Sequence, residues 1–222
     1  MLSAIAIVPS APVIVPELAS GAAAELTDLR EAVFTAAAAL PSRWIAVGVG
    51  HTDTVVKPPR SGTFAGYGVD VQVALSAGEC DAPMQLPLCA LMAGWLRGQV
   101  NPEAATEVRV YADAAVDTGT QLRTEIDEAH DAIGVLVVAD GANTLTQPAP
   151  GGYDPDSIPV QAALDDALAA GDAKALASLP ATIVGRVAYQ VLAGLEPEPQ
   201  SVEELYRGAP YGVGYFAGVW LP

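Results

Sequence analysis

The sequence is poor in basic side chains and in cysteine. Only 10 of its 222 residues are Lys or Arg, against 26 Asp or Glu, so the formal net charge is -16. This charge repels nucleic-acid phosphates and anionic lipid headgroups alike, which argues against both as partners. Cys80 and Cys89 are too few for a disulfide framework and too far apart for a CxxC motif. We expect both to be reduced and structural.

Long apolar runs are also missing. Gly, Pro or a charge interrupts each apolar stretch before it reaches the roughly 18 residues that a membrane span needs. Residues 1–9 are apolar, but they lack a basic flank and a small-residue cleavage pattern, so they predict a first buried strand rather than a signal peptide. We therefore expect a cytoplasmic protein that does not bind membranes.

Histidine is scarce, and this limits the metal chemistry that the chain can support. With only His51 and His130, a three-histidine site is impossible. His130 lies in the polar segment 125–131 ahead of a predicted strand, so we expect it at the surface, at the edge of the sheet opposite to a ligand site. The GxSxG, P-loop and GxGxxG motifs are absent too, which leaves serine hydrolase, NTPase and dinucleotide-binding functions without support.

Apolar residues, by contrast, are abundant at 51% of the chain, enough for a core with two faces. Short aliphatic runs predict buried strands at 2–8, 44–49, 69–75, 107–111, 133–138 and 211–220. Apolar residues at helical spacing predict helices over 26–40 and 183–195. This alternation predicts a single α/β domain over residues 1–222, doubly wound, with a mostly parallel central sheet and helices on both faces.

Two local patterns predict helix boundaries. Ser157, with Pro159 in the first turn, is typical of a helix start, and Gly171 of the end of that helix. Ser201 followed three residues later by Glu204 is the pattern of a capping box. We therefore expect a short final helix at that point.

The candidate site follows from the predicted sheet, because open α/β sheets bind ligands beyond the carboxyl ends of their strands. Ser10, His51 and Asp140 come just after predicted strands, and two long loops rich in Pro and Gly, 51–68 and 140–156, belong to the same edge. His51 is a candidate either for pocket chemistry or for a loop hydrogen bond. Asp140 could equally contact a ligand or fix its own loop through backbone N–H groups.

Five motifs along the chain carry a family resemblance. Pro9–Pro12 (Pro-Ser-Ala-Pro) precedes Val15–Glu17 (Val-Pro-Glu), Asp140–Asn143 (Asp-Gly-Ala-Asn) precedes Ala149–Pro155 (Ala-Pro-Gly-Gly-Tyr-Asp-Pro), and Gly-Val-Gly-Tyr closes the series at Gly212–Tyr215. This series resembles, nearly end to end, the class III extradiol ring-cleavage dioxygenases of the LigB type. In that family the first motif reads Pro-His-Pro-Pro and the third reads Asp-Leu-Ser-His.

The resemblance implies a non-haem Fe(II) site of two histidines and a glutamate, with a further histidine as acid/base. Only His51 matches one of these positions. Ser10 fills the first ligand position and Asn143 the acid/base position, and Ile183 or a neighbour in the segment 182–185 takes the place of the glutamate. Serine and isoleucine supply almost none of the affinity that iron needs, and an amide cannot exchange a proton near neutral pH. We expect no catalytic residue and no cofactor, or at most a divalent metal, Fe or Zn, at His51.

The sequence thus predicts a catalytically degenerate relative of these dioxygenases that acts as a small-ligand-binding or interaction protein. Its pocket would be lined by Ser10, His51, Asp140, Asn143, Tyr153 and Ile183. We expect a small polar or aromatic ligand, and a homodimer or a partner subunit.

Two alternatives stay open at this point. The first is an active oxidoreductase: a metal-dependent ring-cleavage dioxygenase rebuilt around His51, Asp140 and Glu17, or a metal-free chemistry with His51 as base. The second is a folded scaffold whose pocket has filled in.

Overall fold

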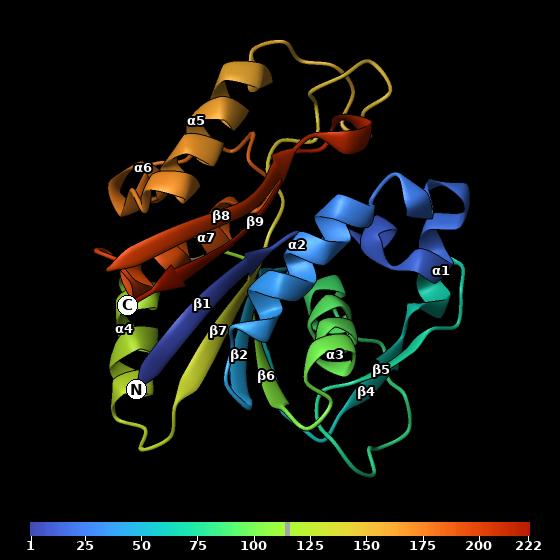
Figure 1. The fold of residues 1–222 in the computed structure, drawn as a ribbon, viewed down its shortest axis with the longest axis vertical. Helices are drawn as coiled ribbons and strands as arrows, with labels where there is room; N and C mark the ends of the chain where they lie inside the picture. Colours follow the sequence, from blue (N-terminus) through green and yellow to red (C-terminus); the bar gives the residue numbers. More distant parts are fainter. Residues whose placement is uncertain (114–115) are drawn as a thin grey trace.

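The computed structural model describes residues 1–113 and 116–222 of the chain. Its centre is a seven-stranded sheet in the order β3-β6-β2-β7-β1-β9-β8 (Figure 1). The four middle strands are parallel: β1 (Leu2–Val8), β2 (Arg43–Val49), β6 (Ala105–Tyr111) and β7 (Ile133–Val138). Antiparallel strands flank them: β3 (Thr54–Val56) beside β6, and β9 (Tyr215–Leu221) followed by β8 (Ser201–Gly208) beside β1. A separate two-stranded sheet pairs β4 (Ser61–Thr63) with β5 (Gln72–Ala74).

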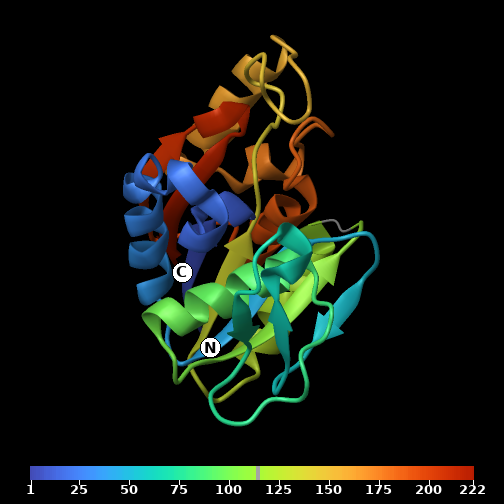
Figure 2. The ribbon, with the colours of Figure 1, turned by 90° about the vertical axis from the view of Figure 1, so that its right-hand side faces the viewer.

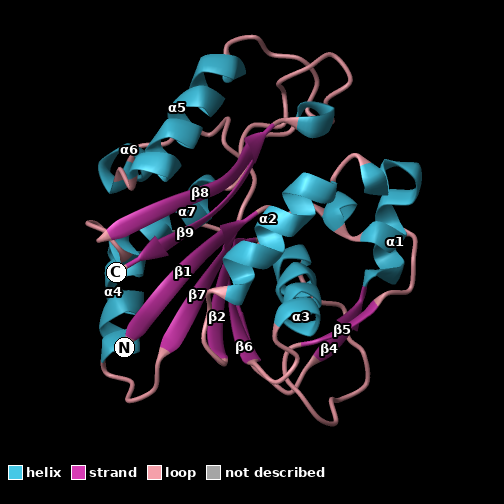
Figure 3. Cartoon of the chain, viewed as in Figure 1, coloured by secondary structure: helices cyan, strands magenta, loops and turns pink. Residues whose placement is uncertain are grey.

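Helices cover both faces of the large sheet (Figures 2 and 3). One face carries α2 (Thr27–Ala38) and α3 (Leu88–Val100). The other carries α4 (Val116–Asp127), α5 (Ser157–Ala170), α6 (Ala173–Ala177) and α7 (Arg186–Leu195). Shorter turns complete the chain: α1 (Pro16–Ala19), η1 (Pro12–Ile14), η2 (Ser20–Ala24), η3 (Phe64–Tyr67) and η4 (Pro210–Gly212). The predicted fold class, a doubly wound α/β fold, is confirmed.

Burial on both faces explains why three of the parallel strands, β1, β2 and β7, are nearly continuous apolar runs. In β1, Ala6 and Val8 pack in the core beneath α2 and α3, whereas Ile5 and Ile7 pack in the core beneath α4 and α7. All six residues of β7 are buried. A strand with two buried faces shows no alternation of polar and apolar residues. β6 does alternate, with Glu107 and Arg109 beside buried Val108 and Val110. The strand predictions at 2–8, 44–49, 107–111 and 133–138 are confirmed.

Two glycines allow α4 and α7 to touch backbone to backbone. A Cβ added to Gly119 would lie 2.0 Å from the carbonyl oxygen of Val191, and one added to Gly194 would lie 1.8 Å from that of Val116. Side chains at either position would force the helices apart. This contact fixes α7, and with it the segment just before α7 that leads back to the carboxyl edge of the sheet.

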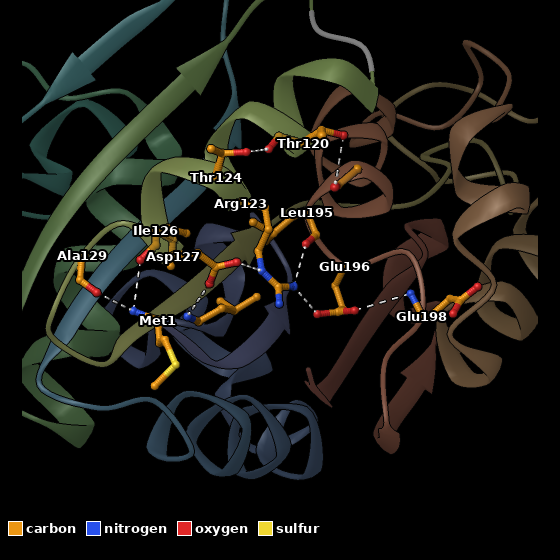
Figure 4. A network of polar contacts seen from close by, with 12 residues as sticks. Met1, Thr120, Arg123, Thr124, Ile126, Asp127, Ala129, Leu195, Glu196 and Glu198 are labelled. Carbon is orange, nitrogen blue, oxygen red and sulfur yellow. Dashed lines mark hydrogen bonds and ion pairs between the residues drawn. The ribbon is translucent and has the colours of Figure 1, made fainter.

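A polar network reinforces the same contact (Figure 4). The Arg123 guanidinium on α4 donates to the carboxylate of Asp127 at 2.7 Å and to that of Glu196 at 2.6 Å, and it also reaches the Leu195 carbonyl oxygen at 3.2 Å. Glu196 follows α7 and is buried. A buried carboxylate is tolerated here because a guanidinium and a backbone N–H, that of Glu198, both bind it.

The helix predicted after Ser201 is wrong. Residues Ser201–Gly208 form β8, paired antiparallel with β9. The pairing shifts register between Glu204 and Tyr206, and this bulge breaks the two-residue alternation that marks a strand. Long-range pairing with β9 therefore overrides the local capping pattern.

Other boundaries shifted as well. Within the strand predicted at 69–75, only Gln72–Ala74 is extended, and it belongs to the small sheet. The last strand begins at Tyr215, because Tyr211 and Gly212 take left-handed backbone conformations, with φ of 59° and 77°. The helix α5 begins at Ser157 and ends before Gly171, as predicted. In the part of the chain that the structure describes, no helix combines the length and apolarity required to cross a membrane.

Candidate ligand-binding site

A cavity of about 320 Å³ lies at the carboxyl ends of three neighbouring strands, β1, β7 and β2. These strands lead into Ser10, Asp140 and His51, which all line the cavity. The rest of its wall consists mainly of aliphatic side chains and glycine backbone: Val49, Gly50, Leu88, Val138, Ala139, Val184 and Gly185. From β2 the chain moves outward to β6 and then returns to β7, and α/β folds bind their ligands at such a reversal.

Asp140 is the only acidic residue among the described residues that line this cavity. Its Oδ1 accepts a hydrogen bond from the Ser10 backbone N–H at 2.8 Å. Burial raises the pKa of this carboxyl to about 7, and the Ser10 hydrogen bond offsets only part of that shift. Within the part of the chain that the structure describes, no group donates to Oδ2. One oxygen thus joins the loops after β1 and β7, and the other remains available to a ligand.

The segment before α7 fixes the backbone at Asp140 by hydrogen bonding. The Gly185 N–H donates to the Asp140 backbone carbonyl at 2.8 Å, and a Cβ on Gly185 would lie 2.6 Å from that oxygen. One turn into α7, the Tyr189 hydroxyl donates to the Ala139 carbonyl at 3.0 Å. Burial raises the pKa of Tyr189 well above its usual value, and the nearby Asp140 carboxyl adds to the shift. Tyr189 therefore acts as a neutral hydrogen-bond donor that holds the end of β7.

Gln161 on α5 clamps the loop that follows Asp140. Its side-chain oxygen accepts from the Ala142 N–H at 2.7 Å, and its amide nitrogen donates to Asp165 at 2.8 Å. The amide lies between Gly141 and Gly214, where an added Cβ would come within 2.1 Å and 2.2 Å of Gln161. The two glycines thus leave the room that this buried amide occupies.

His51 lies at the rim of the cavity, directly after β2, and it is exposed. The loop is held at Gly50, whose N–H donates to the Tyr111 carbonyl at 3.0 Å. His51 also lines an adjoining cavity of about 490 Å³, together with Tyr67 and Gln85. The imidazole therefore stands between two hollows on the carboxyl edge of the sheet.

The other three predicted site residues do not line the cavity. The Asn143 carbonyl accepts from the Gly151 N–H at 2.9 Å, and its side chain packs against the same glycine. Tyr153 is 45% exposed, farther along this loop. Ile183 is only 1% exposed and packs in the core beneath α7.

The residues present do not fit a ferrous site. Within residues 1–113 and 116–222, no three side chains of His, Cys, Asp or Glu gather closely enough to hold a metal ion. Glu17, the third ligand of the rebuilt site considered above, lines a different cavity beside Trp95 and Arg97. Ile183 has no donor atom and lies in the core. A facial set of imidazole and carboxylate ligands is therefore missing from the described residues at this edge.

Several lining residues carried no chemical signal in the sequence. Leu88 begins α3, and Val184 precedes α7 with 47% of its surface exposed at the cavity. Gly185 could have been found from its place just before an apolar helix, since glycine marks close approach of backbones. His130 lies after α4, at the amino ends of the parallel strands, as predicted, and its surface is exposed.

Comparisons with known proteins identify the fold alone. No family model and no curated protein matches the sequence. Among solved structures, the chain is similar to uncharacterized protein JW3007 from Escherichia coli K12, with a TM-score of 0.53, 9% sequence identity, and coverage of 99% of this chain and 100% of that one. The two chains share a fold. At this identity the likeness extends over the whole chain but carries no information on activity.

Proposed function

We propose that this chain is a small-ligand-binding protein on a scaffold related to the LigB-type extradiol dioxygenases, and that it works without their iron centre. The observation that carries this proposal is the cavity beyond β1, β7 and β2, where Asp140 is the one carboxyl among the described lining residues. The resemblance places Ser10 and His51 at former iron-ligand positions, and both line this same cavity. Its volume, about 320 Å³, lies at the lower end of the range for small-molecule sites.

The chemistry of the wall favours binding over catalysis by the family's route. An aliphatic floor removes the apolar body of a ligand from water, and a few polar groups at the rim fix its orientation. Ser10, His51 and Asp140 supply such groups. Asn143, at the acid/base position of the resemblance, packs on Gly151 away from the cavity and cannot exchange protons.

Phenol, a neutral apolar probe with one donor, tests whether the cavity binds ligands. Titration followed by ¹⁵N NMR should shift the amide signals of Ser10, Gly50 and Gly185. Val184→Trp, which fills the mouth of the cavity from an exposed rim position, should abolish these shifts. Ile158→Trp is the matched control, because Ile158 is equally exposed (48%) but lies on α5. Shifts that survive Val184→Trp, or none in the wild type, would overturn the proposal.

Metal content gives the second test. After anaerobic incubation with Fe(II), Zn(II) or Mn(II) and desalting, plasma mass spectrometry should find metal far below one ion per chain, and equally little in His51→Ala. Near-stoichiometric metal that disappears in His51→Ala would instead establish a rebuilt metal centre and return attention to oxygen-consumption assays with catechols.

A further inference from the structure

The polar groups of the cavity restrict the charge that its ligand can carry. Among the described residues that line the cavity or the adjoining hollow past His51, Asp140 supplies the only carboxyl, and none is Lys or Arg. The whole chain carries a formal net charge of -16. An anionic ligand would therefore meet an ionised or easily ionised carboxyl with no compensating cation among these lining residues.

The free oxygen of Asp140 determines the kind of donor that fits. Oδ1 is occupied by the Ser10 N–H, and in the described part of the chain Oδ2 has no protein donor. Asp140 is half-buried, and Oδ2 is not sealed off inside the protein. A ligand that brings N–H or O–H groups to Oδ2 therefore takes the place of water as its donor. A cationic donor also adds direct charge attraction, which is strong where aliphatic walls exclude water.

An ammonium group meets both conditions better than a hydroxyl group does. It has three N–H donors and a positive charge, whereas a hydroxyl has one donor and no charge. Asp140 supplies one acceptor, and the Ser10 hydroxyl and the His51 imidazole, which line the same cavity, can supply further acceptors. The aliphatic side chains of Leu88 and Val138 are left to cover an apolar body.

We infer that the ligand of this cavity is a primary amine, bound as its ammonium ion, with an apolar or aromatic body about the size of one ring. The inference rests on the proposed function and specifies its ligand class. In this arrangement the ammonium N–H groups donate to Asp140, and the ring lies on Leu88, Val138 and Ala139.

Three probes with the same ring and similar arms separate the contribution of the ligand's charge from that of its ring: 2-phenylethylammonium, 2-phenylethanol and 3-phenylpropionate. Isothermal titration calorimetry at pH 8 keeps the amine protonated, since alkylammonium groups titrate near about 10. The ammonium probe should bind at least about tenfold more tightly than the alcohol, a difference of about 1.4 kcal/mol. The carboxylate should not bind measurably.

Asp140→Asn should weaken the ammonium probe at least about tenfold and leave the alcohol nearly unchanged, because the amide keeps the shape but loses the charge. Asp172→Asn is the matched control, since this exposed carboxylate also accepts from a backbone N–H, that of Ala175, but does so at α6. If Asp140→Asn does not fold, Val184→Trp provides the second variant and should lose ammonium binding altogether.

The outcomes distinguish failure of the amine inference from failure of the proposed function. Equal affinity for the ammonium and alcohol probes, or an unchanged ammonium affinity in Asp140→Asn, would overturn the amine inference and leave a neutral-ligand protein. The amine inference also fails if the chain binds phenol in its cavity but does not bind 2-phenylethylammonium. Failure of the phenol titration itself overturns the proposed function.

Discussion

Asp140→Asn should stabilise the protein, and increasingly so as the pH rises. In the folded chain, burial raises the pKa of Asp140 from 3.8 to about 7. Between these two values the folded state holds a proton that the unfolded chain has released, so this group lowers the free energy of unfolding as the pH rises. An asparagine at position 140 never ionises. It can still accept the hydrogen bond from the Ser10 N–H, so the loop contact is kept.

The size of the effect follows from the shift. Roughly three pKa units correspond to about 4 kcal/mol once the folded carboxyl is fully ionised, and this is an upper bound because water can enter the cavity and relieve the charge. About 1–2 kcal/mol of this destabilisation is already present at pH 5, because the unfolded carboxyl is ionised there and the folded one is not. The gain in stability on going from Asp140 to asparagine should therefore grow by about 2–3 kcal/mol between pH 5 and pH 8.5.

Urea denaturation of the two proteins at several pH values measures this difference directly. Asp172→Asn serves again as control: it is the same substitution at an exposed side chain, so a pH trend that it shares with Asp140→Asn would not come from burial. A constant difference between Asp140→Asn and wild type, or a variant less stable than wild type at pH 8.5, would refute the reasoning. It would mean that Asp140 has a cationic or donor partner in the folded protein.

Two further predictions concern the supports of the cavity. Gly194→Ala places a methyl group 1.8 Å from the Val116 carbonyl oxygen, so α4 and α7 must separate. The free energy of unfolding should fall by at least about 2 kcal/mol. In the control, Gly98→Ala on α3, the methyl group meets nothing within 4 Å, so the free energy of unfolding should stay unchanged or rise by up to about 1 kcal/mol. Gln161→Leu leaves the Ala142 N–H without its acceptor, which should lower the free energy of unfolding by about 1–3 kcal/mol, speed hydrogen exchange at the Ala142 amide and weaken phenol binding. The control, Gln121→Leu on the exposed side of α4, should do none of these. An Ala142 amide that still exchanges slowly in Gln161→Leu would contradict the role given to Gln161.

The sheet could be predicted from the sequence where burial alone determines the pattern. The runs that became β1, β2 and β7 are apolar on both faces, and their burial needs no knowledge of the neighbouring strand. β6 shows the alternating pattern instead, with Glu107 and Arg109 beside buried Val108 and Val110. The prediction for Ser201–Gly208 was wrong for the opposite reason. Its strand exists because β9 pairs with it across a bulge, and that pairing leaves no local trace in the sequence.

The residues of the candidate site also fall into those that could be predicted from the sequence and those that could not. Ser10, His51 and Asp140 could be placed together because each directly follows a parallel strand, and the carboxyl ends of such strands meet at one edge. Asn143 and Tyr153 lie farther along the loop after Asp140, where turn geometry at Gly151 and Gly152 decides the direction of each side chain. Leu88 and Val184 come from distant segments, and aliphatic lining residues have no chemical signature of their own.

The burial of Asp140 also bears on whether the cavity is only the remnant of a lost iron site. The volume of about 320 Å³ is still open at this edge, and the carboxyl beside it has its pKa raised to about 7. Replacing one carboxyl oxygen by an amide nitrogen would remove the penalty and keep the Ser10 hydrogen bond. Ionisable groups held at such a cost are concentrated at functional sites, because a bound partner or substrate uses the strained charge. The balance between a binding protein and an inert scaffold therefore rests on Asp140 more than on the missing iron ligands.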